Sequence, residues 1–517
     1  MHSNIKKVSK QFLILESICV GIFAGAIGVS FRIALAYTEL LRTKFLLWTQ
    51  HIPVLGFIIW ILVVLFAGCM AGISSKLVPH ASGSGIPQVK ALLNNMLRVN
   101  WWKIILAKFI GGLFALGSGF SLGREGPTVQ LGAAMAQGIS RLTGRPKSEE
   151  KYLITSGAAA GLAAAFNAPL AAVIFALEEL QHNFSPYVIS STLIASVFAD
   201  LVAQKFTGKS PVIKVSDLTV IPLRYFLLLI VIGVLAGITG IVFNKLIKKS
   251  TEFTERFDIS KMYWVLSAAV LVAVIGYIYP VTLGGGNELI LDIMHGRVLL
   301  LAIPMIFLLK FVLTITCYAT GVPGGIFLPM LVIGALLGSF YGQGLAYFIP
   351  DLLQYANTYA VIGMAAIFSA IVRAPVTGTV LIIEMTGTFQ HLFSLLTASM
   401  TAFLIAEHFE VKPVYEMLMN RLIRKNHKRK QNIYIDDKIL IDITVETGSL
   451  MELKQVKSIK LPQSILLVTI RRGNDEILPK GDTILYAGDI ITVLIPEEDK
   501  VTIVSELDKL FKSKRML

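Results

Sequence analysis

Residues 112–132 read GLFALGSGFSLGREGPTVQLG and place the charged pair Arg124 and Glu125 between glycines and a proline inside an apolar region. Residues 321–334, GVPGGIFLPMLVIG, repeat the spacing of those glycines and that proline. Segments interrupted by glycine and proline at corresponding positions of two halves are typical of transporter folds, whose broken helices meet near the bilayer midplane. The repeated positions are Gly119, Gly123, Pro127 and Gly132 in the first half and Gly321, Gly325, Pro329 and Gly334 in the second.

A second correspondence follows in the same order. Ala168-Pro169-Leu170 precedes an apolar run that ends in Glu178, and Ala374-Pro375-Val376 precedes one that ends in Glu384. The two halves therefore match twice, which indicates an internal repeat. The matched carboxylates, Glu178 and Glu384, are predicted to be structural.

The composition is that of an integral membrane protein. Of 517 residues 55% are hydrophobic and only 15% are charged, far from the balance of a soluble domain. At least ten apolar segments approach the roughly 20 residues that a membrane helix needs. The first is interpreted as a retained helix rather than a cleaved signal peptide, because no small-residue cleavage site follows it. The clearest are 12–35, 52–73, 225–243, 264–278 and 298–315.

The net charge of +14 is concentrated beside these segments. RLIRKNHKRK at 421–430 follows the last segment, and Lys6, Lys7 and Lys10 precede the first. Flanking positive residues stay in the cytoplasm, so both termini are predicted there, with an even number of crossings and no nucleic-acid partner. The three cysteines lie in apolar segments without metal-ligand spacing and are predicted to be small buried residues, so no metal site is expected.

The character of the chain changes near residue 430. We predict a membrane domain over 1–425, a basic linker over 426–436 and a soluble α+β module over 437–517. Alternating strands are expected at 439–446, 465–472 and 476–495, with a turn at 473–475 and a closing amphipathic helix.

Three glycine-rich breaks each precede a helix: GSGIPQVK (83–90), GREGPTVQLG (123–132) and GGIFLPMLVIG (324–334). Such a break leaves backbone N–H groups aimed at one spot, and the helix dipole adds positive potential there. Partial charges bind an anion weakly enough to release it, so the predicted cargo is a small, weakly hydrated anion. The alternative for each single motif is close helix packing by glycine.

The motifs GSGIP, GREGP, GGIFLP and KPVYEML (412–418), in this order, resemble those of the CLC family of chloride channels and proton-coupled chloride transporters. The resemblance covers roughly residues 10–420. It implies an all-α polytopic membrane protein, with two inverted repeats of broken, tilted helices. It also implies a homodimer in which each subunit has its own anion pathway.

The resemblance implies a set of chloride ligands. Ser84 offers its hydroxyl, Tyr415 its phenol, and Ile326 and Phe327 their backbone amides. Such donors supply partial positive charge in a site of low dielectric constant. For Tyr415 the alternative is an aromatic anchor at the membrane interface. Ser84 also favours chloride over nitrate.

The resemblance implies that Glu125 is both the gate and a proton carrier. A carboxylate within a membrane costs about 3 kcal/mol or more, so it is a functional candidate by default. Its side chain can occupy the anion's own site and, once protonated, swing out to admit chloride. The alternative is that Glu125 only pairs with Arg124.

Glu179 matches the internal proton-transfer glutamate of family members that exchange two chlorides per proton. The favoured function is therefore a secondary active chloride/proton exchanger with no enzymatic activity. The alternatives are a passive chloride channel of the same fold and, for Glu179 itself, a solvated helix end.

Residues 458–499 are similar to the TrkA-C (RCK-C) domain, through the elements LP, IRRG, PKGDT and AGD. Such domains dimerise, and some bind cyclic di-AMP, so a cyclic dinucleotide is the expected regulator and no other cofactor is expected. The alternative is a dimer-stabilising module without a ligand. The fusion indicates a bacterial plasma membrane.

Overall fold

The computed structural model describes residues 10–145, 147–181, 185–213, 218–257, 260–430, 438–459, 465–472, 475–496 and 500–511. The chain forms two compact units, Met1–Leu422 and Ile423–Leu517. The predicted linker at 426–436 begins as helix, because α17 (Val414–Lys430) continues through its first residues. Residues 431–437 lie outside the described part of the chain.

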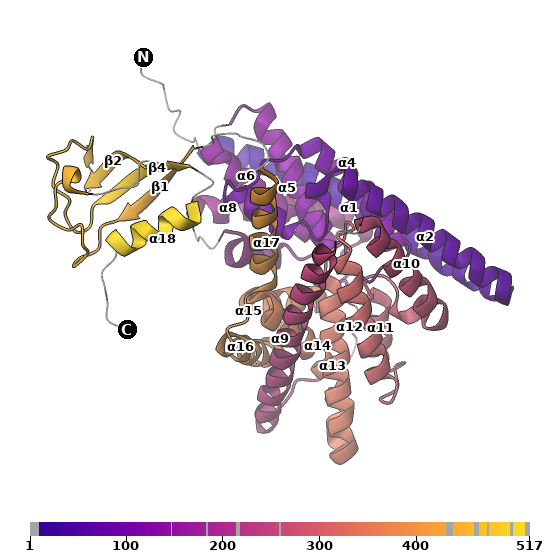
Figure 1. Ribbon diagram of the computed structural model, residues 1–517. Helices are drawn as coiled ribbons and strands as arrows, with labels where there is room; N and C mark the ends of the chain where they lie inside the picture. The colour runs from indigo at the N-terminus through magenta and orange to yellow at the C-terminus, as the bar shows by residue number, and fades with distance from the viewer. Residues whose placement is uncertain are drawn as a thin grey trace. The chain divides into compact units, whose positions relative to one another are not determined.

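The described elements of the membrane unit are helices joined by loops, and they fall into two halves (Figure 1). The first half consists of α1 (Lys10–Gln50), α2 (Pro53–Leu77), η1 (Pro79–Ala81), α3 (Ile86–Leu93), α4 (Trp101–Gly117), α5 (Glu125–Leu142), α6 (Lys147–Phe166), α7 (Pro169–Phe175), the π-helical turn η2 (Ala176–Gln181) and α8 (Pro186–Thr207). The second half consists of η3 (Leu223–Tyr225), α9 (Phe226–Arg256), α10 (Lys261–Ile278), η4 (Pro280–Thr282), α11 (Asn287–Met294), α12 (Ile303–Ala319), α13 (Phe327–Phe348), η5 (Pro350–Tyr355), α14 (Ala356–Val372), α15 (Pro375–Thr386), α16 (Leu392–His408) and α17.

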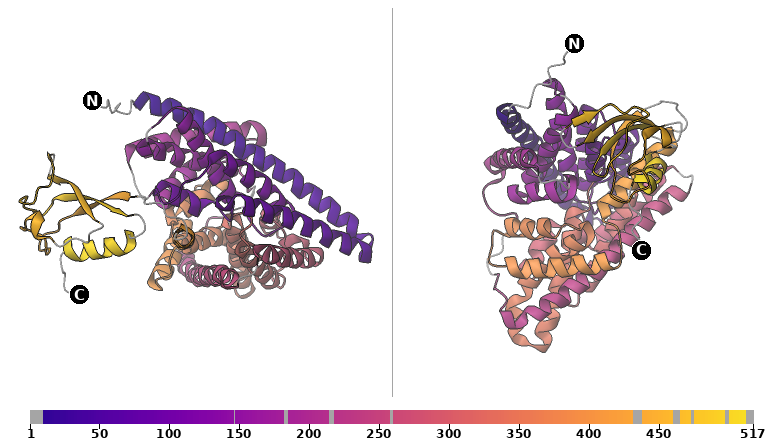
Figure 2. Two further views of the ribbon diagram at one scale, coloured as in Figure 1. Left: turned by 45° about the horizontal axis from the view of Figure 1, so that its top comes forward. Right: turned by 90° about the vertical axis from the view of Figure 1, so that its left-hand side faces the viewer.

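Seven of the described helices are long and apolar enough to cross a membrane. Three further apolar helices, Ile303–Ala319, Pro375–Thr386 and Leu392–His408, are shorter. Together these are ten apolar helices among the described residues, so the expected number of apolar segments is found, although three of them are shorter than 18 residues. In both views of Figure 2 the first-half helices, indigo to magenta, lie beside the second-half helices, pink to orange.

The two halves contact each other through matched interactions. The loops before α5 and α13 pair as an antiparallel bridge, in which the Gly123 amide donates to Gly325 O at 2.6 Å and the Gly325 amide donates to Gly123 O at 2.8 Å. Each half thus supplies the same group to the other, as a twofold relation between inverted repeats requires. This arrangement is the one expected of two inverted repeats of broken helices.

Each of the two matched carboxylates binds the start of a helix in the other half. Glu384, near the end of α15, accepts hydrogen bonds from the amides of Leu170 and Ala171 at the start of α7, at 3.1 and 2.7 Å. Glu178 accepts from Thr377 N and Thr377 Oγ1 at the start of α15, at 2.8 and 2.7 Å. Each carboxylate therefore satisfies free amides at the positive end of a helix in the other half. The predicted structural role has a clear geometric basis.

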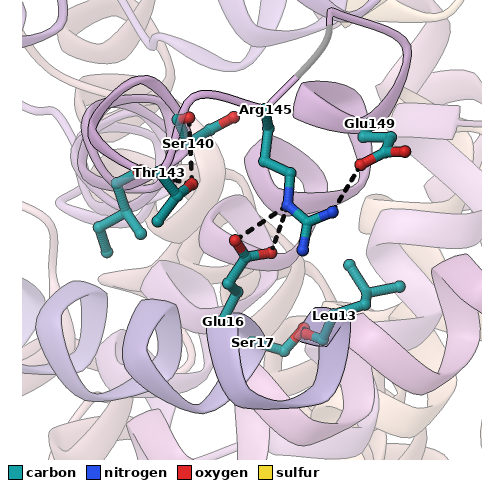
Figure 3. Close-up of polar contacts among 8 residues, drawn as sticks. Leu13, Glu16, Ser17, Ser140, Thr143, Arg145 and Glu149 are labelled. Atoms are coloured by element: carbon teal, nitrogen blue, oxygen red, sulfur yellow. Dashed lines mark hydrogen bonds and ion pairs between the residues drawn. The ribbon is translucent and has the colours of Figure 1, made fainter. Parts of the chain in front are cut away.

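Ion pairs tie the turn between α5 and α6 to α1 (Figure 3). Arg145 Nε lies 2.9 Å from Glu16 Oε1, and its Nη1 lies 2.8 Å from Glu149 Oε2. One guanidinium thus joins α1 to the first turn of α6.

The cysteines depart from the prediction that all are buried. Cys317 on α12 is buried, but Cys69 on α2 is half-buried and Cys19 on α1 is exposed on the surface of the unit. The reason is that α1 and α2 present apolar residues on their outer sides as well as on their packed sides, as helices in contact with lipid do.

The second unit contains a four-stranded antiparallel sheet in the order β1-β4-β2-β3, with one helix, α18 (Lys500–Phe511). Burial alternates along β4, so that Ile491, Val493 and Ile495 face the core. The predicted strands and closing helix are found, although the expected long third strand is two short strands separated by a loop, and residues 473–474 of the expected turn lie outside the described residues. The bounds are β1 (Lys438–Thr444), η6 (Val456–Ser458), β2 (Leu466–Arg472), β3 (Asp475–Ile477) and β4 (Ile490–Pro496).

Candidate functional site

The three glycine-rich breaks lie together in the structure. The Gly83 amide donates to Gly321 O at 3.1 Å, and the Gly324 amide donates to Gly83 O at 3.0 Å. With the bridge between Gly123 and Gly325, these bonds join the loops that precede α3, α5 and α13. Three helix N-termini are therefore held in one cluster, as the anion-site prediction requires.

Ser84 lies in the loop before α3, with a relative exposure of 1%. Its hydroxyl has no hydrogen-bond partner among the described residues. Gly85, which follows, has φ +100°, a left-handed conformation that glycine adopts without strain. Ser84 also lies against the first turn of α5, where a side chain larger than glycine at Gly126 would overlap it. The hydroxyl is thus buried, without a partner among the described residues, and beside the first turn of α5.

Glu125 is the first residue of α5 and is fully buried. Neither carboxylate oxygen makes a hydrogen bond of ordinary geometry within the described structure. The carboxylate lies beside Gly123 and the amide of Leu328, which belongs to the first turn of α13. A negative group therefore stands at the positive end of a helix from the other half of the repeat.

The alternative of a simple ion pair with Arg124 has weak geometric support. Arg124 Nε lies 4.0 Å from Glu125 Oε1, at the outer limit of an ion pair, and it too lacks a hydrogen bond to any described residue. The two side chains attract each other but do not fix each other's position.

Ile326 and Phe327 stand at the N-cap and first position of α13, and both are fully buried. A helix leaves the amides of its first turn without partners in the helix. The Phe327 ring packs against Phe166 and Phe368, with ring centres 5.4 and 4.9 Å apart. Aromatic packing thus fixes the residue whose amide is predicted to bind the anion.

Tyr415, on the first turn of α17, is fully buried, and its hydroxyl has no partner among the described residues. Glu125, Glu179 and Tyr318 are all close enough to influence it electrostatically. Aromatic anchors sit at the interface with one wet end, so full burial argues against that alternative.

Glu179 lies in η2, with a relative exposure of 3%. Lys90 Nζ donates to its Oε1 at 2.7 Å. The alternative of a solvated helix end does not fit a buried carboxylate paired with a buried ammonium. Its neighbour Glu178 is instead committed to the start of α15.

Several residues at the site were not predicted from the sequence. Lys108 is fully buried on α4, and its Nζ donates to Ala81 O and Gly83 O at 2.9 and 2.6 Å, which fixes the loop that carries Ser84. Lys310 on α12 donates in the same way to Thr282 O and Gly284 O, at 3.1 and 2.6 Å. A lysine inside an apolar run was the available signal for both. Tyr318, whose ring lies beside Gly83, carried none.

The arrangement can hold a small anion without an ammonium group in direct contact. Amides at helix ends and two buried hydroxyls present partial positive charge in a region of low dielectric constant, where such contacts are strong. Glu125 can compete for the same amides because its carboxylate is itself an anion. The site therefore suits reversible exchange between a bound anion and a protein carboxylate.

Comparisons with known proteins place the chain among membrane transporters. Residues 66–407 match the family model described as voltage gated chloride channel, and residues 440–503 match the TrkA-C domain. The chain is 36% identical over 80% of its length to a Vibrio campbellii protein named H(+)/Cl(-) exchange transporter ClcA, covering 90% of that protein. A protein of the same name from Cronobacter sakazakii is 35% identical over 82% of this chain and 92% of the relative. The crystal structure of a slow cyanobacterial Cl-/H+ antiporter superimposes with a TM-score of 0.76 and 29% identity, over 80% of this chain and 98% of that one.

Proposed function

This chain belongs to the voltage-gated chloride channel (CLC) family, and we propose that it is a secondary active antiporter that exchanges chloride for protons. The observation that carries the proposal is Glu125, a fully buried carboxylate without a hydrogen-bond partner in the described structure, set at the amides of a helix end. Relatives named as H(+)/Cl(-) exchange transporters and a similar Cl-/H+ antiporter structure support exchange over passive conduction.

In this proposal chloride binds between Ser84, Tyr415 and the amides of Ile326 and Phe327. The hydroxyls of Ser84 and Tyr415 are buried and have no other partner among the described residues, so an anion would satisfy both. Leaving two buried hydroxyls without acceptors costs about 1 to 3 kcal/mol each, which an arriving anion recovers. The anion is the substrate, and no cofactor is part of the proposal.

Protons take a route with two carboxylates. Glu125 blocks the anion site while ionised, and it releases the site when it takes up a proton. Glu179, which is buried and paired with Lys90, passes the proton to and from the cytoplasmic side. Tyr415 is electrostatically close to both, which supports a short path between them.

The test is proton movement into liposomes that contain the purified protein under a chloride gradient alone. Exchange predicts uphill proton pumping that disappears in Glu125→Gln and in Glu179→Gln. Chloride flux without proton movement in the unmodified protein would instead establish a passive channel.

We further propose a homodimer in a bacterial plasma membrane, with both termini in the cytoplasm and domain limits at 1–425, 426–436 and 437–517. The basic residues that flank the helices support this orientation. The TrkA-C domain would regulate transport through a cyclic dinucleotide such as cyclic di-AMP. Calorimetry of the full chain with cyclic di-AMP tests this, and no heat with any cyclic dinucleotide would leave the domain as a dimerisation module.

A further inference from the structure

A buried ion pair joins the helix of the anion site to the proton site. Lys90 lies near the end of α3, Glu179 lies in η2, and the two side chains are only 5% and 4% exposed. Removing two charges from water is costly, and a buried pair loses about 3 to 5 kcal/mol when one partner is lost. Adding a proton to Glu179, or removing the charge of Lys90, therefore changes the energy of this buried pair strongly.

The two ends of α3 serve two different groups. Ser84 and Gly85 precede its first turn, and Lys90 lies four residues after Ile86, about 6 Å along the helix at the usual rise per residue. The helix is short and almost completely buried, so we treat it as a rigid element. A single rigid element thus carries an anion ligand at one end and the partner of Glu179 at the other.

The other groups around Glu179 do not duplicate Lys90. Glu178 and Glu416 are the further charged groups that act on it, and both are negative. From α6, Thr155 accepts a hydrogen bond from Gln181, and the phenols of Tyr152 on α6 and Tyr187 on α8 pack on each other. Tyr415 approaches from α17. Among the described residues, the cation that acts on Glu179 is Lys90.

We infer that Lys90 is a positioning residue of the proton pathway, which favours the ionised form of Glu179 against the cost of its burial and so sets the cytoplasmic proton concentration at which exchange runs. The inference rests on the proposed exchange function. It differs from a purely structural role, in which Lys90 would only complement the C-terminal end of the α3 dipole.

The ion pair also offers a link between proton and anion. When Glu179 takes up a proton, the ammonium of Lys90 loses its counter-charge while it remains buried. An anion at the other end of α3 can then supply negative charge that the buried ammonium has lost. Arrival of the proton therefore favours occupancy of the anion site, which is the order of events that coupled exchange needs.

The test measures chloride efflux and proton movement by full-length protein in liposomes over a series of symmetric pH values. Lys90→Met removes the charge at nearly constant volume, and Lys90→Arg retains it. We expect the midpoint of the pH profile to move upward by about one unit or more in Lys90→Met, because an attraction at hydrogen-bond distance is lost. Lys90→Arg should stay near the unmodified midpoint. In a Glu179→Gln background, Lys90→Met should add no further shift.

An unchanged midpoint in Lys90→Met would overturn the inference, and so would a shift that persists without Glu179. Inactivity of Lys90→Met at every pH would also count against it, because at the acid end the pair is already broken in the unmodified protein. If the unmodified protein moves no protons, the exchange function fails and the role of Lys90 fails with it. Failure of the exchange function can be told apart from failure of the Lys90 inference, because in the other outcomes the unmodified protein still exchanges chloride for protons.

Discussion

Replacing Gly126 by alanine should weaken chloride binding about tenfold or more while leaving the fold in place. Gly126 is the second residue of α5, directly after Glu125. A Cβ atom there would stand 2.8 Å from the backbone oxygen of Ser84 and closer still to its hydroxyl, whereas ordinary contact begins at 3.4 Å. The Ser84 backbone must therefore retreat by 3.4 minus 2.8, about 0.6 Å, and its hydroxyl by more.

The loop that carries Ser84 cannot absorb this shift freely. Gly83 is bonded on both sides, through its amide to Gly321 and through its carbonyl to Gly324 and Lys108. The hydroxyl is nearer to the new methyl group and is the freer part of Ser84, so it moves further than the backbone and out of reach of the anion. A hydrogen bond to a charged group contributes about 1.5 to 3 kcal/mol, and 1.4 kcal/mol corresponds to a factor of ten, so the expected loss of affinity is about 10-fold to 100-fold.

The matched control is Gly344→Ala in α13, where a Cβ meets no atom within 4 Å. Both substitutions gain about the same helix propensity, up to about 1 kcal/mol, so they differ chiefly in the space around the new methyl group. Calorimetric titration of the purified proteins with chloride, together with their thermal unfolding temperatures, separates affinity from stability.

Unmodified affinity in a Gly126→Ala protein that unfolds at the unmodified temperature would refute the assignment of Ser84 as an anion ligand. An equal loss in Gly344→Ala would refute the argument from space.

Three further predictions concern the carboxylates. Glu384→Gln should lower the free energy of unfolding by about 1 to 2 kcal/mol, seen as a lower thermal unfolding temperature, because the helix start at Leu170 and Ala171 loses its negative partner. Glu178→Gln should destabilise similarly yet keep proton-coupled transport in liposomes, whereas its neighbour Glu179→Gln should lose coupling; loss of coupling in both would contradict the separate roles. In the second unit, burial raises the pKa of Asp489. Hydrogen bonds from Arg472 and from the Tyr486 amide together lower it by more than burial raises it, so the pKa of folded Asp489 lies below the ordinary value. The stability this group contributes is therefore fully present above its unfolded pKa of about 3.9 and is lost as the pH falls through the folded pKa. Hydrogen exchange of the β4 amides in the full chain, corrected for intrinsic rates, should show protection that falls in that acidic range, and Asp489→Asn should show weaker protection already at neutral pH.

Much of the site could be predicted because glycine leaves few alternatives. The breaks at Gly123 and Gly325 are needed where two loops pair backbone to backbone, and their spacing was visible as a repeat. Glu125 could be singled out as a candidate because an ionisable residue inside an apolar region has few reasons to be there other than function.

The contact between Lys90 and Glu179 could not be predicted from the sequence, for a physical reason. The partners are 89 residues apart, and their contact depends on how α3 packs against η2. The exact lengths of the helices within the apolar segments were out of reach for a related reason. A hydrophobic pattern reports burial but does not separate burial in lipid from burial inside the protein.

The exchanged carboxylates have a consequence for how the protein is made. The amides at the start of α7 have no acceptor until Glu384 is made. Glu384 lies 213 residues beyond Ala171 and therefore leaves the ribosome much later. During that interval the first half sits in the membrane with uncapped polar groups that lipid cannot satisfy. Neither half is then a finished folding unit, and the nascent chain depends on insertion of the second half, or on shielding by the insertion machinery, until the reciprocal caps close.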